Sequence, residues 1–303
     1  LERYGVNVSE YQYVVIRNTG DLLKSILKKK SEYDFKVVYR FSFPKRRAKI
    51  AFSKNVGLFE TLKSNMQTYS ETNLINQCDL FMPASEQLHE DYFADVTTKR
   101  FILPPAIDPD VLHANIQHKG EEKRFFFAGA LDKIREFDTV LEAFGNIKAD
   151  GFKLMLATEE ENYAKELIAK YPNLQIGKNV DFYVAKTKSE LLALIAKADI
   201  GISLLPNNPI FNTSTPVKVL NYYSSAVPCI MTDNADNSQV FTDDHDAWFC
   251  KFGSDSIKEK VEDILSLSKD EVTEVGVKGQ ERLLEIRNYK TMAGKIYTAF
   301  EAL

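Results

Sequence analysis

Short apolar runs alternate with helical patterns along the whole chain, and this alternation limits the folds that the chain can adopt. The runs are rich in β-branched and aromatic residues and lie at 13–16, 36–39, 80–82, 101–103, 125–127, 153–156, 200–202 and 229–231. Amphipathic stretches such as 138–147 and 189–198 lie between them. This βα repetition predicts an α/β fold with parallel sheets and helices on both faces.

A proline-rich segment divides the pattern into two halves. Prolines cluster between 104 and 109, and polar residues continue to Lys123, which is typical of a linker. With 303 residues, the chain is long enough for two domains. We predict an N-terminal domain over 1–112 that lacks its opening strands, a C-terminal domain over 113–288, and a final helix over 289–303 that packs back across both.

Composition excludes several classes of protein. A hydrophobic fraction of 44% and a charged fraction of 27% are ordinary for globular chains and exclude disordered and fibrous ones. No apolar run approaches the roughly 20 residues of a spanning helix. The cysteines are odd in number and embedded in apolar stretches, at Cys78, Cys229 and Cys250. They indicate buried thiols in a reducing compartment, so we predict a cytoplasmic protein.

Positive charge is concentrated in the first fifty residues, although the whole chain carries a net charge of -4. Two groups stand out, Lys28–Lys30 and Lys45–Arg47. A solvated face is one interpretation. The other is attraction to an anionic surface, which would place the protein peripherally on the inner face of a membrane. Nucleic acid is not expected as a partner, because no recognised binding motif accompanies these residues.

The stretch 212–223 predicts a helix terminus that faces a ligand. It follows an apolar run, contains a Ser/Thr-rich loop, and places Pro216 at the first helical position. Such a terminus presents unpaired amides and a partial positive charge that suit a phosphate, and Lys218 adds a full charge. Lys218, Asn221 and Tyr222 share one helix face. An ordinary crossover helix with a solvated lysine is the alternative.

Several motifs resemble, in the same order, those of the GT-B glycosyltransferases of family 4, the group 1 glycosyltransferases. In the N-terminal half they lie at 76–85 and 102–108, and Tyr39–Ser42 is also similar to the xanthan glucuronosyltransferase group. In the C-terminal half the strand, Gly-x-Leu turn and basic helix of the family appear over 127–144, and a strand motif appears over 198–202. The family signature Pro-x-Lys-x-x-Glu-Tyr appears as Pro216-Val217-Lys218-Val219-Leu220-Asn221-Tyr222.

This resemblance implies a GT-B architecture of two Rossmann-like domains with a cleft between them, the N-terminal one incomplete. It also implies a nucleotide diphosphate sugar, such as a UDP-sugar, held by the C-terminal domain. Arg135 and Lys218 would be the catalytic cations that neutralise the departing diphosphate. The implied donor-binding residues are Gly129, Thr213, Ser214, Thr215, Asn221 and Tyr222. Neither a metal ion nor another cofactor is expected.

The implied activity is transfer of a sugar to a glycan or lipid-linked acceptor in surface polysaccharide assembly. The residues expected on the acceptor or membrane side are Arg40, Ser42, Lys45, Arg46 and Arg47. Phe43 stands where xanthan-type inverting enzymes carry an aspartate base. We therefore favour a retaining mechanism, with Glu60 or Glu71 as the alternative base.

Two departures from the family leave other functions open. Ala130 replaces a frequent arginine, and Asn221 replaces a glutamate that accepts ribose hydroxyls, although an amide oxygen can also accept. The alternatives are a non-catalytic GT-B-like protein that binds a partner, and a sugar-nucleotide epimerase. We expect Phe125–Phe127 in the core, whereas Tyr222 is open between a core residue and a stacking platform.

Overall fold

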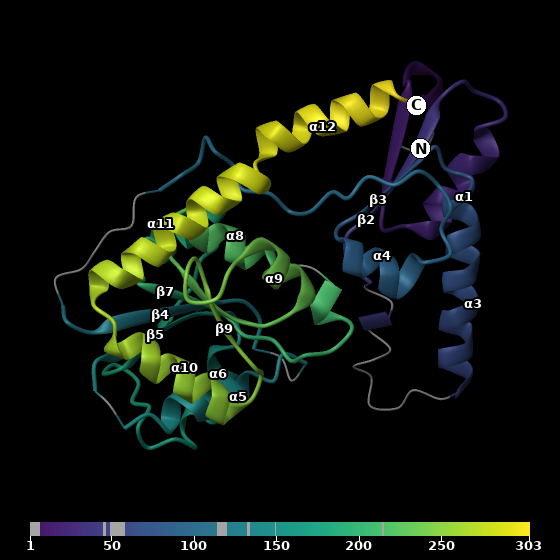
Figure 1. The fold of residues 1–303 in the computed structure, drawn as a ribbon. Coiled ribbons are helices and arrows are strands. Elements are labelled where there is room, and N and C mark those ends of the chain that lie inside the picture. Colours follow the sequence, from purple (N-terminus) through teal and green to yellow (C-terminus); the bar gives the residue numbers. More distant parts are fainter. Residues whose placement is uncertain are drawn as a thin grey trace. The chain divides into compact units, whose positions relative to one another are not determined.

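Two parallel β-sheets organise the chain, one in each of two units (Figure 1). The computed structural model describes residues 7–44, 47–48, 58–113, 120–131, 134–148, 150–213 and 215–303. The N-terminal unit comprises Leu1–Pro104, Asn212–Ser214 and Thr291–Leu303. The C-terminal unit comprises Pro105–Phe211 and Thr215–Lys290. Within both sheets the strand pairs are parallel, which confirms the predicted α/β class.

The N-terminal unit has a sheet of order β1-β2-β3. Its strands are β1 (Tyr13–Arg17), β2 (Lys36–Phe41) and β3 (Leu80–Pro83). Its helices are η2 (Val8–Glu10), α1 (Gly20–Lys29), α3 (Leu58–Ile75) and α4 (Glu86–Phe93). Asp79, directly before β3, binds β2, because its carboxylate accepts a hydrogen bond from Val37 N at 2.7 Å. The same carboxylate forms an ion pair with Lys30, after α1, at 2.7 Å.

The predicted strand at 101–103 is wrong in detail. This segment runs beside β3, since Phe101 N donates to Phe81 O and Leu103 N donates to Pro83 O, each at 2.9 Å. The pairing counts only as an isolated bridge, between Phe81 and Arg100 just before this segment. Prolines at 104 and 105 follow at once and have no amide hydrogen, so they cannot extend the ladder.

Helix α12 (Tyr289–Glu301) confirms the predicted final helix, and from Thr291 onward it belongs to the N-terminal unit. The Tyr13 hydroxyl donates to Phe300 O at 3.1 Å, and the two rings lie 4.9 Å apart. Apolar residues of its last turns pack against buried residues of β2 and β3: Ile296, Ala299 and Phe300 against Val38, Leu80 and Met82.

The C-terminal unit has a six-stranded sheet of order β6-β5-β4-β7-β8-β9. Its strands are β4 (Lys123–Ala128), β5 (Phe152–Ala157), β6 (Val180–Tyr183), β7 (Ile200–Ser203), β8 (Cys229–Thr232) and β9 (Trp248–Cys250). Strands β6 and β9 are not among the strands that the sequence predicted. This is the strand order of a dinucleotide-binding fold, in which the direction of winding reverses between β4 and β7.

Helices cover both faces of this sheet (Figure 1). They are α5 (Phe137–Gly145), α6 (Glu161–Ile168), α7 (Lys188–Ile195), α8 (Val217–Tyr223), α9 (Ala235–Val240), α10 (Ser254–Ser266) and α11 (Lys269–Ile286), with the short turn η3 (Phe211–Thr213) before α8. The capping box of α11 at Ser268 and Glu271 satisfies two of its first amides.

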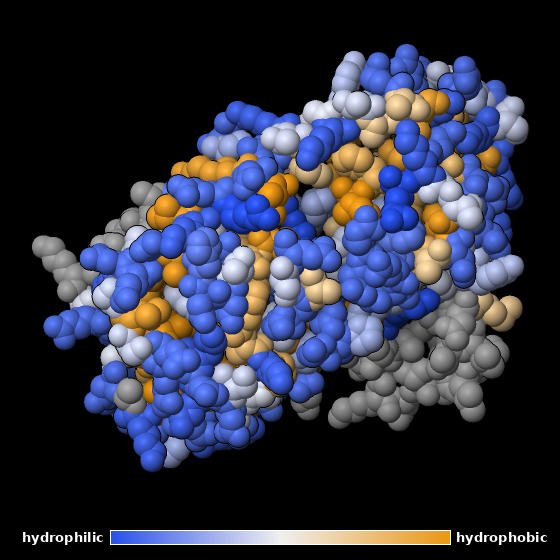
Figure 2. Space-filling model, in the orientation of Figure 1, coloured by the Kyte–Doolittle hydropathy of each residue, from blue (hydrophilic) through white to orange (hydrophobic). Residues whose placement is uncertain are grey.

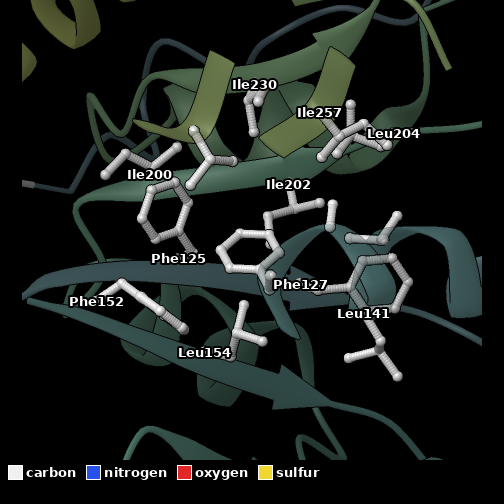
Figure 3. Packing of buried hydrophobic residues seen from close by; sticks show 14 of the residues in the cluster. Phe125, Phe127, Leu141, Phe152, Leu154, Ile200, Ile202, Leu204, Ile230 and Ile257 are labelled. Atoms are coloured by element: carbon white, nitrogen blue, oxygen red, sulfur yellow. The ribbon is translucent and has the colours of Figure 1, made fainter. Parts of the chain in front are cut away.

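The run Phe125–Phe127 lies in the core, as predicted. Because side chains alternate along a strand, Phe125 and Phe127 enter the hydrophobic cluster on one face and Phe126 enters the cluster on the other. Figure 3 shows Phe125 and Phe127 packed with isoleucines of the neighbouring strand β7 and with Leu154 of β5. Strand β4 is thereby anchored on both faces.

The units divide between Pro104 and Pro105, whereas the linker sequence had suggested 112/113. The physical reason is that the linker pairs with the end of α11. Ile107 N donates to Arg287 O at 2.7 Å, and Tyr289 N donates to Ile107 O at 3.0 Å. These bonds tie the linker to the C-terminal unit.

Cys78, Cys229 and Cys250 are buried free thiols, as predicted, and burial raises the pKa of Cys78 and Cys250 to about 12. On the face drawn in Figure 2, hydrophilic residues dominate and apolar residues form several separate groups. Among the residues that the structure describes, no helix is both long and apolar enough to span a membrane.

Candidate functional site

A pocket of ≈ 410 Å³ lies beyond the carboxyl ends of β4, β5 and β6 in the C-terminal unit. We call it the C-terminal pocket; its lining residues fall in three loops, 128–130, 157–160 and 184–188, with Leu191. It lies next to the reversal of winding between β4 and β7. Ligands of open parallel sheets bind at this place, because strand ends and helix N-termini converge there.

Gly129 and Lys218 meet at the edge of this pocket. Gly129 has a φ of +143°, which favours glycine, and a Cβ built there would lie 3.8 Å from Lys218 Nζ. Lys218 comes from α8, and its ammonium lies 4.2 Å from the ring centroid of Phe127. The aromatic face holds the cation beside bare backbone, where the negative charge of a phosphate could approach both.

Glu160 is a pocket residue that the sequence reasoning missed. Its carboxylate accepts from Thr158 Oγ1 at 2.8 Å and from Leu131 N at 3.3 Å, so it holds the turn that follows Gly129. The hydrogen bond from Thr158 lowers the pKa of Glu160, and the charge of Arg135 adds to this effect. Arg135 therefore lies within electrostatic reach of the pocket wall. The acidic run Glu159–Glu161 directly after a strand was the available signal.

The start of helix α7 forms a further wall of the C-terminal pocket, which was not predicted from the sequence. Its N-cap is Thr187, whose hydroxyl accepts from Glu190 N at 3.2 Å. Lys186 and Lys188 flank this cap and line the pocket. Two lysines at the start of α7 thus line the pocket, and Lys218 of α8 lies beside Gly129 of the same pocket.

Two predicted donor-binding residues are core residues instead. Tyr222 is fully buried, its hydroxyl donates to Ile202 O at 3.1 Å, and burial raises its pKa. A Cβ on Gly201 would overlap its ring, so the tyrosine fills the space that the glycine leaves. The amide and hydroxyl of Thr215 both donate to Asp236, at 2.5 and 2.6 Å. Both side chains support the site from within and leave no group for a donor.

The start of α8 also differs from the prediction. Pro216 has a φ of -63° and a ψ of 142° and is the N-cap, so the helix begins at Val217. No side chain caps it. Proline accepts this position because its missing amide hydrogen would have no partner there. Lys218 is therefore the second helical residue, and Asn221 lies half-buried one turn later.

The remaining donor-side predictions are only partly placed. Ser214 lies outside the described residues. Thr213 is buried in the N-terminal unit, and its carbonyl oxygen accepts a hydrogen bond from Ser85. Thr213 therefore belongs to a different unit from the residues that line the C-terminal pocket.

A second pocket, of ≈ 250 Å³, lies beyond the carboxyl ends of β1 and β2. We call it the N-terminal pocket; its lining includes Asp21, Lys24, Phe43, Arg47, Glu71 and Tyr92. The Arg47 guanidinium lies 4.4 Å from the ring centroid of Tyr92. Glu71 accepts a hydrogen bond from the Tyr39 hydroxyl. Two acidic and two basic side chains thus share a pocket with aromatic walls.

Of the predicted acceptor-side residues that the structure describes, Arg47 alone lines this pocket. Ser42 supports it: its amide donates to Asn18 Oδ1 at 2.8 Å, and its hydroxyl accepts from Asn18 Nδ2 at 2.9 Å. Arg40 donates to Leu103 O at 3.3 Å. Lys45 and Arg46 lie outside the described residues.

The chain matches one protein family and is similar in fold to many solved structures. The profile of the family described as Glycosyl transferases group 1 matches residues 109–282, more than half of the chain. No curated protein matches the chain significantly.

Three solved structures illustrate the likeness of fold. Sucrose-phosphate synthase from Thermosynechococcus elongatus has a TM-score of 0.74 at 15% identity, over 97% of this chain and 74% of that one. Anabaena HepE, solved with UDP and glucose, has a TM-score of 0.70 at 12% identity, over 98% and 79%. A mutant of S. aureus TarM, solved with Fondaparinux, alpha-GlcNAc-glycerol and UDP, has a TM-score of 0.65 at 13% identity, over 92% and 54%.

Proposed function

The chain belongs to the group 1 glycosyl transferases and has their GT-B fold, and we propose that it moves a sugar from a nucleoside diphosphate donor to a glycan or lipid-linked acceptor. The observation that carries the donor proposal is the meeting of Gly129 and Lys218 at the C-terminal pocket. Bare backbone and a held ammonium form a site for a diphosphate. HepE and TarM were solved with UDP, so a UDP-sugar is the first donor to test.

The cations have a direct chemical role in this proposal. The acceptor oxygen forms a bond to the anomeric carbon, and the bond from that carbon to the donor phosphate breaks. The bonding electron pair stays on the diphosphate, so its negative charge grows. Lys218 and Arg135 stabilise that charge in the transition state more than in the bound donor, which accelerates transfer. No metal ion is needed for this neutralisation.

We propose retention of configuration, with the acceptor proton ending on the departing phosphate. Phe43 lines the N-terminal pocket and offers no proton acceptor there. Glu71 is the alternative base, because it lines the same pocket and its carboxylate already accepts from the Tyr39 hydroxyl. Comparing the anomeric configuration of donor and product by NMR decides between the two mechanisms.

The N-terminal pocket is the proposed acceptor site. Its two carboxylates and two cations balance, which disfavours a highly charged ligand, whereas its polar groups and aromatic walls suit the hydroxyls and apolar face of a sugar ring. Assembly of surface polysaccharide at an anionic membrane remains part of this proposal. With Arg47 in the pocket, lipid contact would come from exposed lysines such as Lys28, which sedimentation with anionic and neutral liposomes tests.

A donor panel tests the proposed function. We expect UDP and at least one UDP-sugar to raise the melting temperature, because a ligand that binds only the folded state stabilises it by about 2.7 kcal/mol at a hundred times its Kd. Release of UDP should then depend on a glycan acceptor. Binding without turnover would favour the non-catalytic alternative, and isomerised donor in the absence of acceptor would favour the epimerase. No shift with any nucleoside diphosphate contradicts the proposal.

Arg47→Ala tests the acceptor site. We expect the acceptor KM to rise about five- to tenfold while the Kd of UDP stays unchanged, since a guanidinium stacked on an aromatic ring and hydrogen-bonded to ligand contributes roughly 1 kcal/mol. Arg100→Ala is the matched control, because Arg100 belongs to the same unit and forms an exposed pair with Glu86 at 3.2 Å. Equal acceptor KM values for both variants would remove Arg47 from the acceptor site.

A further inference from the structure

A buried ion pair holds Thr215, the residue before the N-cap of helix α8. Asp236 and Arg287 are 3% and 7% exposed. Arg287 donates to both carboxylate oxygens, from Nη1 to Oδ2 at 3.2 Å and from Nη2 to Oδ1 at 2.8 Å. Thr215 adds its amide and its hydroxyl to Oδ2. The carboxylate therefore accepts four hydrogen bonds from two residues that lie far apart in the sequence.

This network fixes the position of Thr215 more than it stabilises the folded protein. Buried ion pairs contribute little net stability, because the loss of hydration offsets much of the attraction. Their bidentate geometry, however, leaves little freedom to the groups that they bind. Thr215 is followed by Pro216, whose ring restricts φ, and then by α8. Fixing Thr215 therefore fixes the first turn of α8, which carries Lys218.

The same ion pair lies close in sequence or by hydrogen bonding to the ends of the two segments that form the C-terminal unit. The segments of this unit run from Pro105 to Phe211 and from Thr215 to Lys290. Thr215 binds Asp236 directly, and Arg287 O accepts the amide of Ile107 at 2.7 Å. Three of the four segment ends are thus anchored at or next to this pair.

We propose that Asp236 and Arg287 are positioning residues of the donor site. They hold Thr215, and through it the first turn of α8, so that Lys218 stays beside the Gly129 turn. We assign neither side chain a contact with the donor, because the Asp236 carboxylate is occupied by Thr215 and Arg287, and Arg287 donates to both of its oxygens. The inference rests on the proposed binding of a nucleoside diphosphate.

Asp236→Asn is the first test. Asparagine keeps the shape and one oxygen but removes the charge that Arg287 requires. We expect the affinity for UDP to fall about tenfold and the acceptor KM to stay unchanged. Asp199→Asn is the matched control, because Asp199 is also buried and its carboxylate accepts from Arg124 N at 2.7 Å, but at the amino end of β7, away from the pocket. Equal UDP affinities in the two variants overturn the proposal.

A double-mutant cycle separates positioning from general damage. If Asp236 acts through Lys218, Asp236→Asn should cost no further UDP affinity once Lys218→Met has been made. Losses that add in the double variant would show a role that is independent of Lys218. Thr215→Val provides a milder variant, since it removes only the hydroxyl donor and keeps the ion pair. We expect it to lower UDP affinity two- to threefold without loss of folded protein.

Hydrogen exchange distinguishes failure of this inference from failure of the proposed function. The Thr215 amide donates to Asp236 and should be protected in the parent protein. Asp236→Asn should speed its exchange at least tenfold, and Asp199→Asn should not. If the parent binds no UDP, the proposed function fails whatever the exchange shows. If the parent binds UDP and the Thr215 amide stays protected in Asp236→Asn, the pair does not hold α8 and the inference is wrong.

Discussion

Lys218→Met is expected to weaken UDP binding about ten- to a hundredfold and to slow sugar transfer. A charge-assisted hydrogen bond to phosphate contributes roughly 1.5 to 3 kcal/mol, and methionine cannot supply it. Methionine keeps an apolar stem over the Phe127 ring, where the lysine ammonium lies 4.2 Å from the centroid. The fold should therefore survive, so that the loss reports the charge alone. Isothermal titration with UDP measures the affinity.

Arg135→Ala should produce a loss of the same order, with one additional effect. Because the charge of Arg135 helps to lower the pKa of Glu160, its removal should let that pKa rise. The control for both variants is Lys258→Met. Lys258 lies on α10 and forms a long ion pair with Glu262, at 3.8 Å. Titration curves of Lys218→Met and Arg135→Ala that match this control would end the donor-site assignment.

Gly276→Ala is expected to destabilise the protein by about 1 to 3 kcal/mol, the usual cost of overpacking. Gly276 lies inside helix α11, where alanine is intrinsically better by roughly 1 kcal/mol. A Cβ there would overlap the carbonyl oxygen of Ala226 and lie 2.7 Å from Pro228 Cδ. Both atoms belong to the turn between α8 and β8 and cannot move aside as a flexible side chain can. Urea unfolding followed by circular dichroism measures the change.

Gly294→Ala is the matched control for this variant. Gly294 also lies in a helix, α12, but a Cβ there would meet nothing within 4 Å. The same substitution should therefore stabilise α12 by about 0.5 to 1 kcal/mol. Two glycine-to-alanine changes in helices would then have opposite signs. If both stabilise, the close packing of α11 on the Ala226 turn is not rigid.

Residues that act through local chemistry were well predicted from the sequence. The triple phenylalanine was assigned to a buried strand because a short aromatic run in a βα pattern has no other stable environment, and all three rings are buried. The three cysteines lie in apolar runs and are buried thiols. Gly129 and Lys218 belong to different motifs, and the structure brings them together.

Residues whose role depends on a distant partner were not predictable in the same way. Tyr222 shares a helix face with Lys218, but the missing side chain of Gly201 opens a space that the tyrosine ring fills. Glu160 was not assigned from the sequence, because its place in the site depends on the hydrogen bonds that its carboxylate accepts from Thr158 and from the Leu131 amide.

The sequence by itself therefore determined the α/β class, the core of every described strand except β6 and β9, and the cation at the start of α8. These follow from periodicity and from chemistry within a few residues. Only the tertiary structure decided the strand order, the boundary at Pro104 and Pro105, and the hydrogen bonding of Thr215 to Asp236, which Arg287 also binds. A hydrogen-bond donor takes the partner that folding brings to it, and a buried carboxylate takes every donor within reach because it has no water to bind.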